Sequence, residues 1–382
     1  MTASIRLALC VLTAVACIAA GAMRSPIAAD DSERILTLDH FVRAPAIPGA
    51  ATGSTLYVRE RVKAGLAARG GAGTRVAVFV HGAGTPAEVS FDVPFGDFSW
   101  MAYLAAGGFD VFSVDMTGYG RSTRIAAMSD PCNIPGNRQA EFVPALLAAP
   151  CTPTVTTQGT TIASDWNDVN AAVDYVRALR HVDQVNLVGW SLGGIRAGGY
   201  AAQHPEKVRR MFLLAPAYIR ASATSAPSPA PAKGDPFSVQ SRTDLVNLWD
   251  SQVGCAGQYE DATLNAIWSD MMASDPVGAS WGPGVRRAPS VTTWGWNQAV
   301  VAKQQTPLLM VSGVHDVQVR QERVRELYAD YGGAQKAFID LGCSSHNAMR
   351  EKNHVQLFKA SLEWLDNATV DGKTSGEFRK GY

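Results

Sequence analysis

One short glycine-flanked stretch contains a serine that could act as a nucleophile. Residues 189–193 read Gly-Trp-Ser-Leu-Gly and fit the pattern G-x-S-x-G, after an apolar run and before a helical run over 194–204. A strand-to-helix turn of this kind exposes the serine hydroxyl at the carboxyl edge of a sheet. The N–H of Leu192 would then lie at a helix N-terminus, where it can stabilise an oxyanion. The pattern therefore predicts acyl transfer by Ser191.

Two further motifs follow earlier apolar runs. His81-Gly82-Ala83-Gly84 comes after the run 75–80, and Asp115–Ser122 has the pattern D-x-x-G-x-G-x-S. In this order, and together with the serine motif, they resemble the α/β-hydrolase family, specifically its esterase- and lipase-like members with a lid after the sixth strand. The resemblance extends over about residues 55 to 365. It implies that the Ala83 N–H is the second oxyanion donor, that His81 anchors its loop, and that the third motif is structural.

A serine hydroxyl needs a base within hydrogen-bond reach, and the base needs an acid that orients it. The resemblance implies the chain order serine, acid, histidine. Asp316 follows the strand expected at 307–311, and His346 follows the last expected strand. His354, at the expected start of the closing helix, is the alternative base. We therefore expect a triad of Ser191, His346 and Asp316.

The expected reaction is hydrolysis of a carboxylic ester through an acyl-enzyme, without cofactor or metal. The same triad serves several chemistries. A serine peptidase of the proline-type aminopeptidase kind is the first alternative, although no obvious acidic pair is available to hold a free amine. Carbon–carbon hydrolases and cofactor-free haloperoxidases resemble the chain equally at the triad, whereas haloalkane dehalogenases use a carboxylate at the position of Ser191. A non-catalytic hydrolase-fold binding protein is a remote alternative, since such proteins often lack triad members.

Alternating strands and helices predict the scaffold. The first expected strand alternates with period two, as an antiparallel strand does, and the others are continuous apolar runs typical of buried parallel strands. This alternation predicts an α/β fold with a mostly parallel central sheet flanked by helices. Strands are expected at 55–63, 75–80, 110–115, 184–189, 208–214, 307–311 and 336–341, and helices at 100–106, 165–179, 194–204 and 355–365.

Two segments interrupt this alternation. Residues 129–157 predict a long proline-bearing excursion, and residues 221–304 begin with a Ser/Ala/Pro-rich stretch and contain no apolar run typical of a buried strand. We interpret 221–304 as a mainly helical cap inserted into a core formed by 30–220 and 305–366. More than half of the nine tryptophans fall in the cap, where they could fill a small helical core or line the substrate site. The expected lining residues are Trp190, Trp249, Trp268, Trp294 and His315.

The N-terminus has the features of a secretory signal. Arg6 precedes an apolar run over 7–20, and Ala20-Gly21-Ala22 offers a cleavage site, so residues 1–22 are expected to be a signal peptide. Lipid anchoring through Cys17 is a minor alternative. At the other end, residues 367–382 are polar and predict a loose tail. A secreted or periplasmic protein without a membrane span in the mature chain is therefore expected.

Four cysteines remain after the signal peptide. They allow three pairings, and the sequence alone does not choose among them. We favour Cys132–Cys151, because both residues lie in one proline-rich excursion, with Cys255–Cys343 tying the cap to the end of a late strand. Free buried thiols are the alternative. No cysteine or histidine spacing matches a zinc site.

The composition excludes several classes of protein. With 47 % hydrophobic and 18 % charged residues the chain can bury a core, which excludes global disorder. The 34 basic and 34 acidic residues cancel, so no overall field attracts nucleic acid. No interior stretch approaches 18 apolar residues, which excludes a multi-span membrane protein. The expected partner is a small-molecule ester, and the aromatic-rich cap favours an apolar or aromatic group in it.

Overall fold

In the computed structural model the described residues are 31–45, 53–146 and 150–382. The expected signal peptide and Cys17 lie outside these ranges. Among the described residues, no helix combines the length and the apolar character needed to cross a bilayer.

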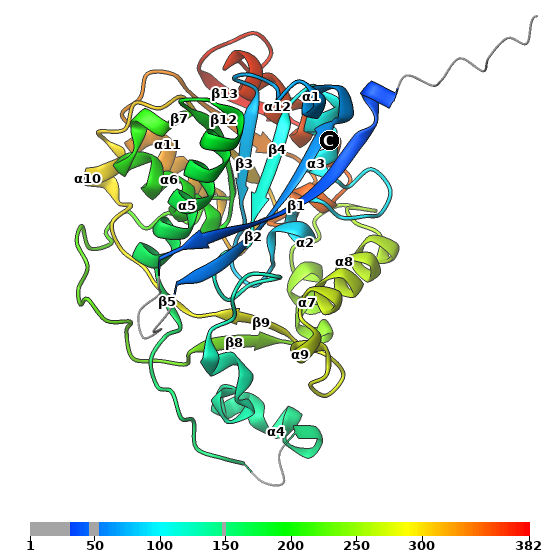
Figure 1. Ribbon diagram of the computed structural model, residues 1–382, viewed down its shortest axis with the longest axis vertical. Helices are drawn as coiled ribbons and strands as arrows, with labels where there is room; N and C mark the ends of the chain where they lie inside the picture. The colour runs from blue at the N-terminus through cyan, green and yellow to red at the C-terminus, as the bar shows by residue number, and fades with distance from the viewer. Residues whose placement is uncertain (1–30, 46–52, 147–149) are drawn as a thin grey trace, which may run out of the picture. The chain divides into compact units, whose positions relative to one another are not determined.

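A nine-stranded sheet forms the centre of the unit that extends from Ser32 to Tyr382 (Figure 1). β1 and β2 pair antiparallel, β2 pairs antiparallel with β4, and every other neighbouring pair is parallel. The mostly parallel α/β fold expected from the sequence is thereby confirmed. In sheet order the strands are β1 (Ile35–Ala44), β2 (Ser54–Lys63), β4 (Asp110–Val114), β3 (Val76–Val80), β6 (Val185–Trp190), β7 (Val208–Leu214), β11 (Leu308–Gly313), β12 (Lys336–Leu341) and β13 (Gly376–Lys380).

Helices cover both faces of this sheet. α3 (Trp100–Ala106) and α12 (His354–Asn367) pack against each other on one face, while α5 (Ile162–Arg180), α6 (Leu192–Gln203) and α11 (Gln321–Asp330) lie on the other (Figure 1). Because β3, β4 and β6 are buried at every position, their sequences are mostly apolar, with Asp110, Ser113 and Asn186 as the polar exceptions. Shorter elements are α1 (Ala64–Ala68), α2 (Ala87–Phe91), the two-residue strand β5 (Thr160–Thr161), and 3₁₀ turns at Ala126–Ser129, Pro131–Asn133, Pro205–Lys207 and Ala348–Arg350.

The two outer strands were not expected from the sequence. β1 pairs with β2 along its whole length. The C-terminal residues do not form a loose tail: β13 pairs parallel with β12, and the Gly342 N–H donates to Lys380 O at 2.8 Å. The expectation of a tail over 367–382 is therefore wrong. β13 is an edge strand whose exposure alternates, and among its residues Phe378 packs on the core, so its sequence is mostly polar.

Between β7 and β11 the chain leaves the sheet at its carboxyl edge. The small antiparallel pair of β8 and β9 accompanies the helices there. The last part of this segment does not separate from the core, because Trp294, Trp296 and Val301 belong to the main apolar cluster; the cap boundary expected at 304 is thus too late. The elements are β8 (Phe237–Gln240), α7 (Arg242–Asp250), α8 (Asp261–Ser274), α9 (Pro276–Ala279), β9 (Arg286–Pro289), β10 (Val291–Thr292) and α10 (Gln298–Val301).

The chain between β7 and β11, residues 215–307, is called the inserted segment below. Two apolar clusters pack it against the rest of the molecule. In one, Leu245, Trp249 and Ile267 pack against Val89 and Val93 near α2. The second joins the segment to the excursion after β4, which contains α4 (Gly136–Leu146). Its members are Ile125, Met128, Ile134, Phe142, Phe237, Trp281 and Val285.

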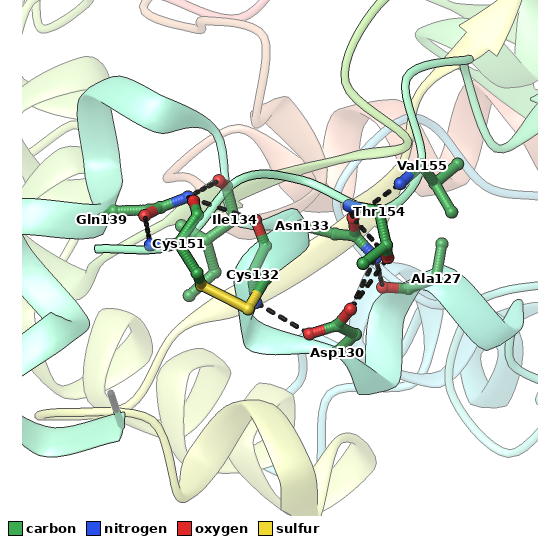
Figure 2. The surroundings of a disulfide bond; sticks show 9 residues. All are labelled: Ala127, Asp130, Cys132, Asn133, Ile134, Gln139, Cys151, Thr154 and Val155. Atoms are coloured by element: carbon green, nitrogen blue, oxygen red, sulfur yellow. Dashed lines mark hydrogen bonds between the residues drawn. A yellow bond between two sulfur atoms is a disulfide. The ribbon is translucent and has the colours of Figure 1, made fainter. Parts of the chain in front are cut away.

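The excursion is closed by the favoured local disulfide. Cys132 and Cys151 are bonded, with their Cα atoms 5.4 Å apart. Figure 2 shows the polar contacts around this bond. The side-chain amide of Gln139 donates to Cys132 O and Cys151 O, and Asn133 Oδ1 accepts the N–H of Thr154 at 2.8 Å. The described residues of the excursion, 129–146 and 150–157, therefore form a bonded structure that packs against the inserted segment.

Candidate active site

Ser191 occupies a strained turn between β6 and α6. Its φ of 58° and ψ of −121° lie in a region that side-chain-bearing residues rarely adopt. Backbone hydrogen bonds hold it there: its N–H donates to Leu214 O at 3.0 Å, and its carbonyl accepts the N–H groups of Gly194 and Ala217 at 2.8 Å each. The strand-to-helix turn expected for a nucleophilic serine is present at this position.

The loop after β3 lies directly against this turn. A Cβ atom at Gly82 would stand 2.8 Å from the Cβ of Ser191, so only glycine permits the approach. Ala83, the next residue, lines the same cavity as Ser191. Leu192 is the first residue of α6, so its N–H has no acceptor within the helix. The two amides expected as oxyanion donors thus belong to segments that meet at the serine.

His81 and Arg196 anchor this loop from beneath. The Nδ1–H of His81 donates to Gly82 O at 2.7 Å, and its Nε2 accepts the Met116 N–H at 3.1 Å. Complete burial, helped by the charge of Arg196, holds the His81 pKa well below its usual range. Arg196 donates to His81 O at 2.9 Å and pairs with Asp165 at 2.7 Å. His81 is therefore neutral and inside the fold, as its anchoring role requires, whereas Arg196 was not singled out from the sequence.

Asp316 and His346 meet beyond the ends of β11 and β12. The Nδ1 atom of His346 lies 2.8 Å from Asp316 Oδ2. The other carboxylate oxygen accepts the N–H groups of Gln318 and Val319, both at 2.8 Å. Because a carboxylate only accepts hydrogen bonds, Nδ1 carries the proton and Nε2 has the free lone pair. His354, the alternative base, lies elsewhere, with its Nε2 2.9 Å from Asp97.

Ser191 and His346 line one cavity of about 150 Å³. Trp190 and Trp249, two of the expected lining residues, contribute to its wall, and Trp268, Trp294 and His315 do not. Trp268 packs in the cluster around Trp249, Trp294 stands edge-on to Trp166 in the main core, and His315 lies against Gly254. The full wall consists of Ala83, Gly84, Trp190, Ser191, Ser238, Leu245, Leu248, Trp249, Arg286, Gln318, His346, Asn347 and Arg350.

Two buried polar residues that were not predicted from the sequence form hydrogen bonds to the loop that carries His346. Gln252, from the inserted segment, accepts the His346 N–H at 3.4 Å and the Val317 N–H at 3.3 Å. Glu351 accepts the Ser345 N–H and the Trp249 indole N–H, both at 2.7 Å. Burial raises the Glu351 pKa against the effect of these bonds. No local sequence pattern marks such residues, because their partners are distant in the chain.

The second favoured disulfide ties the same region together. Cys255 and Cys343 are bonded, with a Cα–Cα distance of 5.7 Å. The bond links the inserted segment to the residue three positions before His346. Both cysteine pairings favoured from the sequence are thus found in the structure.

Two arginines complete the wall of the cavity. Burial lowers the pKa of Arg286 to about 10. Burial together with the charge of Arg286 lowers the pKa of Arg350 to about 9. Both remain positively charged near neutral pH, so the space in front of Ser191 is electropositive.

Comparisons with known proteins agree with this architecture. A family model described as alpha/beta hydrolase fold matches residues 76–330. CarC, a serine hydrolase involved in carbazole degradation, is 17 % identical, with a TM-score of 0.53 over 87 % of this chain and 99 % of its own. A thermophilic esterase from Thermogutta terrifontis is 12 % identical, with a TM-score of 0.50 over 87 % of this chain and 100 % of its own.

A third similar structure is the meta-cleavage product hydrolase from Pseudomonas fluorescens IP01. It is 14 % identical, with a TM-score of 0.50 over 86 % of this chain and 98 % of its own. No curated protein sequence matches the chain. At these identities the similar structures share the fold, and the chemistry has to be argued from the site itself.

Proposed function

Since this chain belongs to the alpha/beta hydrolase fold family, we propose that it is a serine hydrolase that cleaves carboxylic esters through an acyl-enzyme on Ser191. The observation that carries the proposal is the 2.8 Å hydrogen bond between His346 and Asp316, with His346 and the strained Ser191 in the wall of one cavity. These are the nucleophile, base and orienting acid that acyl transfer needs.

In the proposed mechanism the free Nε2 of His346 removes the proton from Ser191 as its Oγ attacks the ester carbonyl. The amides of Leu192 and Ala83 stabilise the resulting oxyanion. Asp316 holds the imidazole orientation and balances its charge once it is protonated. His346 then gives the proton to the leaving alcohol, and a water molecule activated by the same histidine releases the acid.

The charge of the cavity favours an ester over the peptidase alternative. A peptidase that binds a free α-amine needs acidic groups close to the scissile bond. The charged residues in this wall, apart from the histidine, are Arg286 and Arg350, and no aspartate or glutamate of the described chain belongs to it. Trp190 and Trp249 support an apolar or aromatic portion in the substrate, and the volume of the cavity limits that portion to a small group.

Labelling and turnover test the proposal together. A fluorophosphonate probe should label the wild-type protein and leave Ser191→Ala unlabelled, which excludes a purely binding function. p-Nitrophenyl esters of graded chain length should be hydrolysed faster than aminoacyl-anilides, and the activity should disappear in Ser191→Ala. Faster turnover of the anilides would favour a peptidase. Absence of both labelling and turnover would refute the serine hydrolase.

Export from the cytoplasm is part of the proposal. Two disulfides occur among the described residues, and such bonds persist in oxidising compartments. This supports residues 1–22 as a removable signal peptide. N-terminal sequencing of the exported protein should find the mature chain beginning shortly after residue 22, and recovery of the intact N-terminus would contradict removal.

A further inference from the structure

Arg286 and Arg350 face the cavity without an acidic partner. Both line it together with Ser191 and His346, and the Arg350 side chain is 1 % exposed. Among the described residues, neither guanidinium forms an ion pair with a carboxylate, and Arg350 Nε has no hydrogen-bond partner. Two positive charges therefore stand together beside the proposed nucleophile.

The two arginines are held by neutral groups. Arg350 donates to Val89 O at 2.8 Å and lies 5.2 Å from the ring centroid of Trp190. Arg286 donates to Thr85 Oγ1 at 3.0 Å, and its guanidinium covers Gly84, where a Cβ would stand 2.6 Å from Cζ. These contacts fix the position of each charge without neutralising it.

Two buried arginines show what a structural role looks like; Arg350 is buried as they are, and Arg286 is partly exposed. Arg287, next to Arg286 in sequence, makes two hydrogen bonds to Asp275 at 2.8 and 2.6 Å. Arg196 pairs with Asp165 at 2.7 Å. A buried charge is costly unless it is paired, and the fold supplies a carboxylate in both of these cases. At the cavity it supplies no carboxylate at ion-pair distance, and the charge of Arg286 disfavours the charged form of Arg350.

Two carboxyls, the buried Glu351 and the half-buried Asp270, act on Arg350 from beyond ion-pair distance. Asp270 and Glu351 both favour its charged form. Glu351 is already bonded to Ser345, Trp249 and Gln258. Burial raises the pKa of Asp270 to about 6. Neither residue belongs to the wall of the cavity, so neither occupies the space between the arginines and the serine.

We propose that the substrate carries a carboxylate a few carbon atoms away from its scissile ester and that Arg286 and Arg350 bind this carboxylate. The inference rests on the proposed ester hydrolysis for the reaction and on the arginines alone for the substrate class. Guanidinium groups match a carboxylate in charge and in planar geometry. A cavity of about 150 Å³ has the volume of roughly five water molecules, which suits a half-ester of a short dicarboxylic acid.

Monomethyl glutarate is a concrete substrate of this class. In its hydrolysis the acyl C–O bond breaks, water supplies a hydroxyl group to the acyl carbon and a proton to methanol, and the free carboxylate is unchanged. Its neutral isostere is methyl glutaramate, in which an amide replaces that carboxylate. The two esters differ in charge and are nearly equal in size, so their ratio of kcat/KM isolates the contribution of the arginines.

The first experiment compares the two esters with wild-type protein and variants. We expect the wild type to favour the anionic ester by at least about tenfold, since hydrogen bonds to charged groups contribute this much or more. Arg286→Gln should lower kcat/KM for the anionic ester by about 10- to 100-fold more than kcat/KM for the neutral ester. Arg286→Lys should restore part of the loss. Arg242→Gln, which loses a bond to Asn265 on the surface of the inserted segment, is the matched control and should behave as wild type.

Binding without turnover separates the two proposals. Calorimetry should detect monomethyl glutarate bound to Ser191→Ala and much weaker binding to Ser191→Ala/Arg286→Gln. If this difference is found but neither ester is hydrolysed by the wild type, the anion site stands and the ester reaction is wrong. Serine-dependent hydrolysis of both esters at equal rates, with equal binding by the two variants, would overturn the anion site and leave the hydrolase. A near-wild-type unfolding temperature for Arg286→Gln excludes misfolding as the cause.

Discussion

The indole N–H of Trp190 donates a hydrogen bond to the backbone carbonyl of His346 at 2.8 Å. Trp190 is the residue before the proposed nucleophile, and His346 is the proposed base, so a single bond joins the end of β6 to the loop that follows β12. The two rings also contact, with centroids 5.5 Å apart. Trp190, the second residue of the serine motif, therefore positions the histidine as well as lining the cavity.

Replacing Trp190 with phenylalanine tests this link. The ring is kept but the donor is lost, which leaves the buried His346 carbonyl unpaired at a cost of about 1–3 kcal/mol. We expect a lower free energy of unfolding and roughly tenfold lower kcat. Trp364→Phe is the control, because Trp364 likewise donates to a buried carbonyl, Met211 O at 2.9 Å, away from the cavity. Equal kcat in both variants would show that the bond stabilises the fold only.

The orienting role of Asp316 predicts the effect of Asp316→Asn. The amide keeps the shape but can donate to His346, which favours the wrong tautomer, so kcat should fall by about 10³- to 10⁴-fold. Substrate KM should change little, because Asp316 does not line the cavity. The control is Asp340→Asn, because Asp340 is an aspartate of β12 that forms an ion pair with Arg325 away from the cavity. Activity of Asp316→Asn within tenfold of the wild type would remove Asp316 from the triad.

The sequence predicted most of the sheet for a clear physical reason. Strands such as β3 and β6 are buried on both faces, so apolar residues occupy every position of β3 and all but Asn186 of β6, and the run is visible without knowledge of its neighbours. β13 was missed because an edge strand is half exposed and its sequence is correspondingly polar. The serine turn was predicted because its geometry needs glycines at fixed offsets.

Residues whose role depends on partners distant in the chain could not be predicted. Gln252 and Arg286 belong to an inserted segment without a repeating pattern, and only the folded chain brings them beside His346 and Ser191. Three of the five expected lining residues were placed wrongly for the same reason. An aromatic residue in the inserted segment packs equally well in a core, as Trp294 does against Trp166.

The two disulfides should differ in their effect on activity. Removal of Cys255–Cys343, which spans 88 residues, should cost about 4–5 kcal/mol of unfolding free energy, and removal of Cys132–Cys151, which spans 19, about 3 kcal/mol. The double serine variant of the first pair should also lose activity several-fold at a temperature where it is folded, because Cys343 precedes the His346 loop. The second pair is the matched control, and we expect its kcat to be unchanged. Equal kcat in both double variants would contradict a positioning role for Cys255–Cys343.

Asp168 should make the stability depend on pH. Burial raises its pKa to about 7, against the opposing hydrogen bond that it accepts from the Thr117 N–H at 2.8 Å. In the unfolded chain an aspartate titrates near 3.9. The folded protein therefore binds the extra proton between about pH 4 and pH 7, and the stability contributed by this proton is complete below pH 4 and lost as the pH rises to 7.

Asp168→Asn removes this titration while keeping an acceptor for Thr117. The variant should gain stability relative to the wild type between pH 4 and pH 8, by up to about 4 kcal/mol. Urea unfolding of the wild type and the variant at pH 4 and at pH 8 measures this gain in stability. Burial also raises the pKa values of Asp115 and Asp110, to about 6 and about 7. These two groups change the free energy of unfolding of the wild type and of the variant equally, so their effect cancels in the difference. The exposed Asp235→Asn serves as control, and a stability difference that does not change with pH would disprove the assignment to Asp168.

Gln252 should influence catalysis without touching the reacting atoms. Its Oε1 accepts the N–H groups of His346 and Val317 at 3.4 and 3.3 Å, so one buried side chain joins the base loop to the acid loop. Gln252→Ala leaves both amides unpaired and frees the two loops to shift, and a shift of this kind should lower kcat by about tenfold or more with a smaller change in KM. Gln335→Ala, which loses a bond to Ala368 O on another side of the molecule, controls for the loss of a glutamine hydrogen bond. The measurement is kcat at a temperature where the wild type and both variants are folded. Unchanged kcat with lowered stability alone would assign Gln252 to the fold and not to the positioning of the base.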